Sequence, residues 1–406
     1  NVDWLIKHQL PGEPVRQRGG SWNYGFTGGG DPSNTQFALL ALGAAQDRGI
    51  EIDAEVFRRS LAYWRPRQRE SGGWSYRDSG RPSGSMTCAG IASVIISRGC
   101  LGVADAADQG DQIQCCGSEQ AGPDPIEKGL DWLANNFTLQ VNPGGDSMTL
   151  FYYLYALERV GRLSGRRFIG DHDWYREGSE RLLSLQDDFE GFWSGSGIME
   201  ENRQVATSFS LLFLSKGKRQ VVVGRVKYGI PGMASSWNRH PDGLRQLVRH
   251  VERDWGRDLT WQTIDVNRAT LQDLLQSPVL VISGRGALSF PRPVSEMLQL
   301  YLDQGGCLVF DADGGNGCGD ATAFENSVRQ LSERWFEGAT LEKLPPTHPG
   351  GFAEHKVEPA SIGPDFWVYG VQACCRTTIF YLPQSLSCRW ELGDRLFHRD
   401  RGSEAI

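Results

Sequence analysis

Two kinds of hydrophobic pattern alternate in the first half of the chain. One kind is apolar on nearly all sides, and Ser, Thr or Asn stands at or beside its start, where a side-chain oxygen caps a first helical turn. The other kind carries charges on one face and Leu, Trp or Phe on the other. The first kind covers residues 34–42, 86–94, 147–154 and 206–212, and the second covers 54–68, 126–137 and 174–186. The first pattern predicts buried helices, and the second predicts helices on an outer surface.

A short Gly-Trp motif stands between these runs and repeats. Gly19-Gly20-Ser21-Trp22-Asn23-Tyr24 returns as Gly72-Gly73-Trp74-Ser75-Tyr76 and, degraded, as Gly191-Phe192-Trp193. One unit therefore consists of an outer helix, a Gly-Trp turn and an inner helix. Helical hairpins repeated in this way predict an α/α toroid or solenoid with its inner helices around an axis. Residues 99–125, rich in Cys, Asp and Gly, are predicted to be a loop insertion.

The spacing Gln68-x-x-x-Gly72-x-Trp74 resembles the Gln-Trp repeat of the squalene-cyclase and protein-prenyltransferase β-subunit superfamily. The resemblance covers roughly residues 1–217. It implies a terpenoid-cyclase-like α/α toroid in which Gln and Trp side chains tie the ends of outer helices together. A further copy, after Gln140, lacks the Trp. The chain supplies fewer hairpins than a complete toroid of this superfamily, so we expect residues to be missing before Asn1.

The chemistry of that superfamily does not transfer to this sequence. Class II cyclases protonate an alkene with an Asp-x-Asp-Asp acid, whereas Asp31 and Asp146 each stand alone here. The prenyltransferases bind zinc through Asp, Cys and His, but Cys88 has no Asp two residues before it and no His in a later inner helix. Asp31 and Asp146 remain the candidate acids. The candidates for a concave ligand-binding surface are aromatic: Trp22, Tyr24, Trp74, Tyr76, Tyr152 and Trp193.

From Gln220 onward, strand-like and helix-like runs alternate. The predicted strands are 220–228, 278–283, 307–310 and 378–382, and the predicted helices are 243–255, 294–304 and 323–336. Such alternation predicts an open, doubly wound, mainly parallel sheet. The whole chain is therefore expected to be multi-domain, α plus α/β. The expected parts are a partial toroid at 1–217, an α/β domain at 218–393 and a tail at 394–406.

Polar loops follow two of the predicted strands, at the strand ends where ligands of doubly wound sheets bind. Arg285 lies between two glycines after one strand, and Asp311 and Asp313 lie in a Gly-rich loop after the next. The two carboxylates are candidates for holding a cation or a ribose. The alternative is a turn that caps the next helix. The sequence lacks the glycine patterns of phosphate-binding loops, so no cofactor is expected.

Residues 301–311 are similar to a strand region of class I glutamine-amidotransferase-like domains. Together with 226–228, 283–286 and 344–349, they resemble an uncharacterised bacterial domain-of-unknown-function family with this flavodoxin-like fold, over roughly residues 217–393. Amidotransferases use a nucleophilic Cys and a later His-x-Glu. Here Cys318 lies between two glycines and His348 is the nearest candidate base, so a Cys-His hydrolase is one hypothesis.

The cysteines predict neither a disulfide framework nor a zinc site. Their number, nine, is odd, and none is arranged as Cys-x-x-Cys or accompanied by His at zinc-finger spacing. No metal is therefore expected. Two adjacent pairs, 115–116 and 374–375, are too close for ordinary bridges within the pair. They are expected to be free thiols or to pair with something else.

Charge and composition narrow the function. The chain has 406 residues and a net charge of −7, so it has no basic field for nucleic acid. Its longest uncharged run, residues 82–97, is shorter than the ~20 apolar residues that span a bilayer. Its 50 glycines gather in the Gly-Trp turns and in the loops at strand ends.

Because both resembled folds lack the acid, metal or nucleophile that their chemistry requires, we expect a non-catalytic binding or scaffold protein. The resemblances place it in the bacterial cell envelope or among exported proteins, and otherwise it is expected in the cytoplasm. Its partner is expected to be an unidentified protein or a small apolar ligand. One alternative is an isoprenoid-processing cyclase or transferase that uses the toroid cavity. The other is the Cys-His hydrolase in the α/β domain.

Overall fold

The chain divides into two compact units. The computed structural model describes residues 1–13, 18–25, 29–102, 107–108, 113–116, 124–145, 147–197, 199–215, 219–229, 236–315, 318–345, 347–351, 367–373 and 375–393. The helical unit consists of Asn1–Val103 and Gln120–Lys218, and the α/β unit consists of Ala104–Glu119 and Arg219–Ile406. The second unit therefore includes much of the predicted insertion at 99–125.

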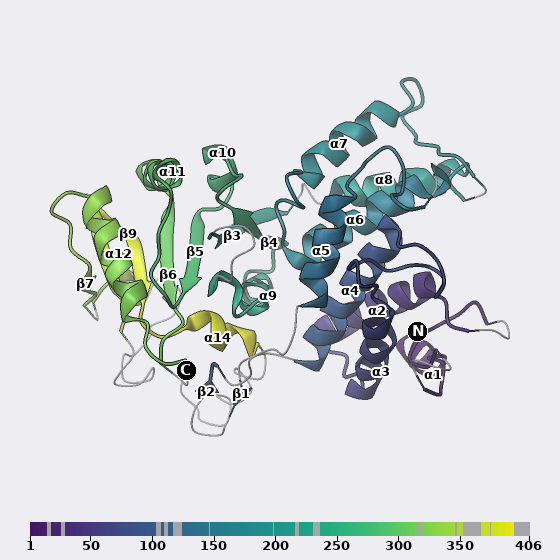
Figure 1. Cartoon of the computed structure of the whole chain (residues 1–406), viewed down its shortest axis with the longest axis horizontal. Helices are drawn as coiled ribbons and strands as arrows, with labels where there is room; N and C mark the ends of the chain where they lie inside the picture. Colours follow the sequence, from purple (N-terminus) through teal and green to yellow (C-terminus); the bar gives the residue numbers. More distant parts are fainter. Residues whose placement is uncertain are drawn as a thin grey trace. The chain divides into compact units, whose positions relative to one another are not determined.

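The described helices of the helical unit follow the alternating hydrophobic pattern (Figure 1). The predicted inner helices are α2 (Pro32–Asp47), α4 (Gly84–Leu101), α6 (Leu150–Ser164, preceded by a 3-10 turn at Ser147–Thr149) and α8 (Arg203–Leu214). The predicted outer helices are α3 (Ala54–Trp64, followed by a 3-10 turn at Arg65–Arg67), α5 (Pro125–Asn135) and α7 (Trp174–Leu185), and α1 (Val2–Lys7) precedes them all. α4 packs against α2, α3, α5 and α6, and α6 packs against α4, α7 and α8. These contacts establish two rows of helices, without showing that the rows close into a ring.

Two inner helices test the prediction that the inner helices are buried on nearly all sides. α4 is buried along most of its length. α4 is long and apolar enough to cross a membrane, and it is the one such helix in the part of the chain that the structure describes. However, 83% of this segment is buried inside the protein, as expected of a core helix. α8 departs from the prediction, because Leu211 and Leu212 are 56% and 41% exposed. It is therefore buried on one side only.

The α/β unit is built on a mixed sheet with the strand order β4-β3-β5-β6-β9-β8-β7. The strands are β3 (Gln220–Lys227), β4 (Leu259–Asp265), β5 (Val279–Gly284), β6 (Cys307–Ala312), β7 (Glu342–Lys343), β8 (Tyr369–Ala373) and β9 (Arg376–Leu382). The first five strands in this order are parallel, and β8 and β7 add an antiparallel edge. Counted along the chain, the parallel strands have the order 2-1-3-4-5 of flavodoxin-like sheets. The four predicted strands are confirmed, whereas the hydrophobic pattern misses β4, β7 and β8.

Helices cover both faces of this sheet. α9 (Gly243–Trp255) packs on the face that includes Val281 and Val309. α12 (Thr322–Trp335) packs on the other face, where Phe324 contacts Phe310. Neighbouring residues of a strand point to opposite faces, so Val309 and Phe310 direct the two helices into separate layers.

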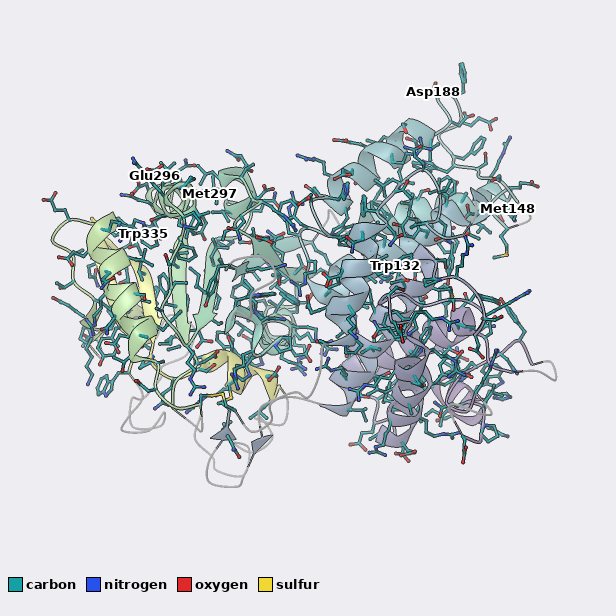
Figure 2. The ribbon with its side chains drawn as sticks, viewed as in Figure 1. Trp132, Met148, Asp188, Glu296, Met297 and Trp335 are labelled. Atoms are coloured by element: carbon teal, nitrogen blue, oxygen red, sulfur yellow. A yellow bond between two sulfur atoms is a disulfide. The ribbon has the colours of Figure 1, made fainter. Side chains whose placement is uncertain are left out.

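Other described helices of this unit complete the layers. They are α10 (Leu271–Leu274), α11 (Arg292–Asp303) and α14 (Leu386–Glu391), with 3-10 turns at Ser236–Asn238 and Pro349–Gly351. The indole of Trp335, labelled in Figure 2, donates to Ser295 and joins α12 to α11. A two-stranded ribbon, β1 (Ala107–Asp108) with β2 (Ile113–Gln114), belongs to the same unit.

Two disulfides fasten the α/β unit. Cys115 bonds to Cys388 on α14, and Cys116 bonds to Cys318 in the loop after β6. The prediction that the cysteines form no disulfide framework is therefore wrong. Each member of the adjacent pair has a partner more than 200 residues away along the chain, which no spacing rule reveals. The other adjacent pair includes Cys374, which lies outside the described residues.

Candidate functional site

The tryptophans of the Gly-Trp turns are core residues. Trp22, Trp74 and Trp193 are at most 3% exposed. Their indole N–H groups donate to backbone carbonyls that precede each turn, those of Leu5, Trp64 and Leu182. Their backbone N–H groups donate to hydroxyls of the following inner helices, those of Thr35, Thr87 and Thr207. The prediction that these three indoles line an accessible surface is wrong, because they join the helices of the repeat from within.

Amide side chains stabilise the same turns. The amide of Gln68 donates to the carbonyls of Gly72 and Pro125, each at 2.8 Å, and so links a turn to the start of the next outer helix. In the copy that lacks Trp, Asn142 bonds both Ser85 and Thr149. The polar side chains of the repeat therefore make hydrogen bonds that stabilise the fold.

A polar pocket of about 580 Å³ lies beside the first Gly-Trp turn; we call it the tyrosine pocket. It is lined by Arg18, Asn23, Tyr24, Gly29, Gly30, Asp31, Pro32, Tyr76, Arg77, Asp78 and Ser79. Tyr24 and Tyr76 are 67% and 47% exposed, so their rings are accessible. The lining therefore combines aromatic faces with charges of both signs.

Asp31 has a structural role at the wall of the tyrosine pocket. Its Oδ1 accepts the backbone N–H of Asn34 at 2.8 Å and so caps α2. Its Oδ2 accepts the hydroxyl of Tyr76. Burial and the bond to Asp31 raise the pKa of Tyr76 above its ordinary value. Both carboxylate oxygens are thus engaged in holding the helix and the ring. Asp146, the other candidate acid, lies outside the described residues.

Arg18 fixes the rim of the tyrosine pocket. Its φ of 54° is in the left-handed region, which no other described non-glycine residue adopts. Its guanidinium donates to the carbonyl of Gly30 at 3.0 Å and pairs with Asp78 at 2.9 Å. A Cβ at Gly29 would lie 2.6 Å from the Arg18 side chain, so this glycine allows the close approach. Strained backbone is retained where surrounding bonds hold it, and such positions gather at functional sites.

Tyr152 belongs to a series of aromatic rings on the inner helices. Its hydroxyl lies 2.8 Å from Ser33 Oγ, and burial raises its pKa. Its ring lies 6.3 Å from that of Phe37 and 5.9 Å from that of Phe209. The series therefore connects α6 to α2 and α8. Of the aromatic candidates, Tyr24 and Tyr76 line the tyrosine pocket, and Tyr152 lies behind it through Ser33, the neighbour of Pro32.

The predicted Cys-His pair does not form in the α/β unit. Cys318 is bonded to Cys116, so it has no free thiol. His348 Nε2 lies 2.9 Å from Thr377 Oγ1, at the start of β9. Cys318 instead follows the end of β6, and β6 and β9 are parallel. The two residues therefore belong to opposite edges of the sheet, and the Cys-His hydrolase hypothesis is wrong.

Asp311 fixes the start of α14. Its carboxylate accepts the backbone N–H groups of Leu386 at 2.8 Å and Ser387 at 3.0 Å. The capping alternative thus applies to Asp311, although the helix it stabilises is α14 and not the next helix along the chain. Arg285 lies against the same loop, since a Cβ at Gly319 would be 2.3 Å from its guanidinium.

Asp313 meets two residues that the sequence pattern does not indicate, and together they form the Asp313 cluster: Asp313, His240 and Glu391. His240 Nδ1 lies 3.0 Å from Glu391 Oε2, and its Nε2 lies 3.8 Å from Asp313 Oδ1. All three residues are buried. Within the described part of the chain, His240 Nε2 and both carboxylate oxygens of Asp313 have no hydrogen bond of ordinary geometry, although the Ser385 side chain is close enough to lower the pKa of Asp313.

Burial and neighbouring charges shift the pKa values in this cluster. Burial raises the pKa of Asp313 to about 6, although the charge of His240 acts in the opposite direction. Burial by itself would lower the pKa of His240. The hydrogen bond to Glu391 and the charges of Glu391, Asp313 and Asp311 outweigh burial, and the pKa of His240 is raised above its ordinary value. The cluster therefore pairs an imidazole with a raised pKa and a carboxyl group whose pKa is raised to about 6.

Comparison with known protein families identifies most of the α/β unit. Residues 222–404 match the domain of unknown function DUF4159. No curated protein matches the chain. The DUF4159 match covers the region in which the sequence resembles an uncharacterised family. The squalene-cyclase resemblance of the helical unit is not supported by a family match.

The Asp313 cluster lies entirely within the DUF4159 domain, and its members come from three separate connections. His240 follows β3, Asp313 follows β6 and Glu391 follows β9, all parallel strands. Their carboxyl ends share one edge, where ligands of such sheets bind. The position of Asp313 after a buried strand was a usable signal, whereas nothing in the local sequence marks His240 or Glu391. Among the described residues, no group of three or more His, Cys, Asp or Glu side chains is arranged to hold a metal ion.

Proposed function

We propose that the protein is an exported binding protein of the bacterial cell envelope, and that its helical unit holds a small, hydroxyl-rich ligand such as a sugar. The tyrosine pocket carries this proposal. Its exposed rings, Tyr24 and Tyr76, stand beside charged groups that donate and accept hydrogen bonds. Such a lining suits a ring that is apolar on its faces and polar around its edge.

The state of Asp31 favours binding over chemistry in the helical unit. A carboxylic acid that protonates an alkene must itself be protonated, which requires an apolar environment that raises its pKa. Asp31 instead accepts two hydrogen bonds and lies beside charged side chains, those of Arg18, Arg77 and Asp78. These observations weigh against the isoprenoid-processing alternative.

The disulfides favour export. Structural disulfides persist in oxidising compartments and are rare in the cytosol. Two of them, Cys115–Cys388 and Cys116–Cys318, hold the α/β unit. We infer from the sequence resemblances that the two rows of helices are part of an α/α toroid and that the α/β unit is an amidotransferase-like relative with a different site.

Isothermal titration calorimetry of the full chain tests ligand binding by the helical unit. The probes are cellobiose, the disaccharide of N-acetylglucosamine, and farnesol as the apolar alternative. The informative variant is Tyr24→Ala, because this ring is 67% exposed and we expect its loss to leave the fold intact. We expect at least one sugar to bind and Tyr24→Ala to weaken it about tenfold, the equivalent of ~1.4 kcal/mol.

The matched control is Phe189→Ala, which removes an aromatic ring that is 99% exposed and lies outside the pocket. It should bind sugar as the unmodified protein does. Binding of farnesol alone, or no binding of either disaccharide, would contradict the proposal.

A further inference from the structure

We propose that the tyrosine pocket selects an acidic sugar, a hydroxyl-rich ring that carries one carboxylate, and that Arg77 pairs with this carboxylate. The inference rests on the proposed sugar binding and goes further, because it names the charge of the ligand and the residue that recognises it. The charged residues of the pocket lining carry it: two arginines, Arg18 and Arg77, and two aspartates, Asp31 and Asp78. Three of these four residues are engaged in bonds within the protein.

Both aspartates of the lining are among the engaged residues. Asp31 caps α2 and accepts the hydroxyl of Tyr76. Asp78 pairs with two guanidinium groups, those of Arg18 at 2.9 Å and Arg67 at 3.5 Å. A carboxylate that two guanidinium groups share adds no surplus of negative charge to the pocket. The lining therefore offers little to attract a cationic ligand.

Arg77 is the lining charge that remains available. Its side chain is exposed, and within the described part of the chain it makes no hydrogen bond or ion pair. Arg18, the other lining arginine, is instead held by the carbonyl of Gly30 at 3.0 Å and by Asp78. A guanidinium group carries its N–H donors in a planar fork that matches the two oxygens of a carboxylate. The group that the pocket leaves for a ligand is therefore a cation.

The loop that carries Arg77 is held in place by a neighbouring arginine. Arg69 donates to Ser75 Oγ at 3.1 Å, on one side of Arg77. On the other side it donates to the carbonyl of Asp78 and, at 3.3 Å, to that of Gly80. A binding group on a loop that is already ordered loses less conformational freedom when the ligand arrives. These bonds therefore favour ion pairing by Arg77.

The charge of the surrounding segment agrees with an anionic ligand. Residues 65–81 contain five arginines and two acidic residues, a local charge of +3 in a chain whose net charge is −7. The side chains of Arg65 and Arg81 are exposed and, like that of Arg77, make no hydrogen bond or ion pair with the described residues. A local surplus of positive charge attracts small anions even where the whole chain is negative.

One negative charge on the ligand fits this pocket better than two. The guanidinium of Arg77 balances one carboxylate, whereas Asp31 and Asp78 belong to the same lining and repel a further charge. A phosphate group carries close to two negative charges at neutral pH, and a uronic acid carries about one. The exposed rings of Tyr24 and Tyr76 remain for the face of the sugar. The lining therefore favours a uronic acid over a sugar phosphate.

Two sugars that differ in one group test this inference on the full chain. Cellobiouronic acid carries a carboxylate where cellobiose carries a hydroxymethyl group. In isothermal titration calorimetry at about 0.1 M NaCl, we expect the acid to bind about tenfold more tightly, because it adds one charge-assisted pair. Raising NaCl to about 1 M shortens the screening length from ~10 Å to ~3 Å and should reduce this preference to about threefold or less.

Arg77→Gln separates recognition of the carboxylate from recognition of the ring. It should remove the tenfold preference and leave the affinity for cellobiose unchanged, whereas Tyr24→Ala should weaken both sugars alike. The matched control is Arg48→Gln. Arg48 is exposed and lies at the other end of α2 from Asp31, about 24 Å away at ~1.5 Å per residue. This variant should retain the preference, because the distance exceeds the screening length of ~10 Å.

The outcomes distinguish this inference from the sugar binding on which it rests. Equal or weaker binding of cellobiouronic acid, a preference that survives Arg77→Gln, or an equal loss in Arg48→Gln would overturn the role of Arg77 and leave sugar binding intact. Tighter binding of cellobiose 6′-phosphate than of the acid would overturn the choice of a single charge. If cellobiose, the disaccharide of N-acetylglucosamine and the acid all fail to bind, both proposals are wrong. The comparison of sugars and salt in the unmodified protein decides even if a variant does not fold.

Discussion

Two buried polar groups, one from each unit, are satisfied in different ways. In the helical unit, Trp74 donates its indole N–H to Trp64 and its backbone N–H to Thr87, so both groups have partners. In the α/β unit, Asp313 is fully buried with two oxygens that have no hydrogen-bond partner among the described residues. The first arrangement serves stability alone. The second costs stability. It is not confined to the α/β unit, because the amide of Gln36 in the helical unit is also buried without a partner among the described residues.

The units also differ in how far their connections reach along the chain. In the helical unit, the bonded residues are 13 apart for Trp74 and Thr87, 57 apart for Gln68 and Pro125, and 119 apart for Ser33 and Tyr152. His240 and Glu391 are 151 residues apart, and the disulfides join residues separated by 202 and 273. Ordering a long segment costs more conformational entropy than ordering a short one. The disulfides of the α/β unit reduce this cost, because they limit the freedom of the unfolded chain.

Removal of a disulfide should give the largest difference between the units. Cys388→Ser combined with Cys115→Ser should lower the free energy of unfolding of the α/β unit by about 2–5 kcal/mol, because the unfolded chain gains freedom. The helical unit should keep its stability. Hydrogen exchange of peptides from α14 and from α4 follows the two units separately. The control is Cys88→Ala in α4, which changes a buried cysteine that forms no disulfide. An equal loss of protection in both units would contradict the comparison.

The pH dependence of stability should distinguish the units next. The pKa of Asp313 in the folded chain is about 6, above its ordinary value of 3.8. Its contribution to stability is therefore fully present below pH 3.8 and is lost as the pH rises through 6. The loss is at most about 3 kcal/mol, at ~1.4 kcal/mol for each pKa unit. The raised pKa of His240 acts in the same direction, with stability present below about pH 6.5 and lost at higher pH.

Asp313→Asn should remove most of this slope. Its side chain is neutral at every pH, so the variant should be more stable than the unmodified protein above pH 7 and similar to it near pH 4. Urea unfolding at pH 4, 6 and 8 measures the difference. Asp258→Asn, whose carboxylate is 81% exposed, should leave the slope unchanged. A steeper slope in Asp313→Asn would show that burial of this carboxylate carries no cost.

The same contrast explains what the sequence predicts and what it does not. The helical pattern, the Gly-Trp turns and the four strands that begin at 220, 278, 307 and 378 are local signals, and the structure contains all of them. β4 lacks a continuous apolar run, since Thr260, Gln262 and Thr263 interrupt it, and the pattern misses it. Burial of the three turn tryptophans also requires knowledge of the packing around them, which periodicity alone does not provide.

The candidate site was predictable only in part. The strand-end rule places Asp311 and Asp313 correctly, but it does not distinguish the carboxylate that caps α14 from the one that remains without a partner. The difference arises because Leu386 and Ser387 contact Asp311, and these residues lie far along the chain. His240 and Glu391 have no local signature, and Cys318 looked like a nucleophile only because its partner at Cys116 is distant.

The smallest expected effect tests whether the repeats of the helical unit are equivalent. Thr87→Val removes the hydroxyl that accepts the backbone N–H of Trp74 at 3.1 Å while keeping the shape of the side chain. The buried N–H then lacks a partner, so the unit should lose about 1 kcal/mol of stability. Urea unfolding followed by tryptophan fluorescence measures this loss.

Thr207→Val removes the equivalent bond to Trp193 at 3.1 Å and should cost less, because this bond is part-buried whereas the Thr87 bond is buried. The exposed control, Thr340→Val, should change stability by less than about 0.5 kcal/mol, since its hydroxyl bonds only to the exposed Glu342. If Thr87→Val cost no more than this control, the Thr-to-turn bond would be incidental. The helical unit would then owe its stability to the packing of its tryptophans, and the repeat would be a hydrophobic pattern whose polar positions are exchangeable.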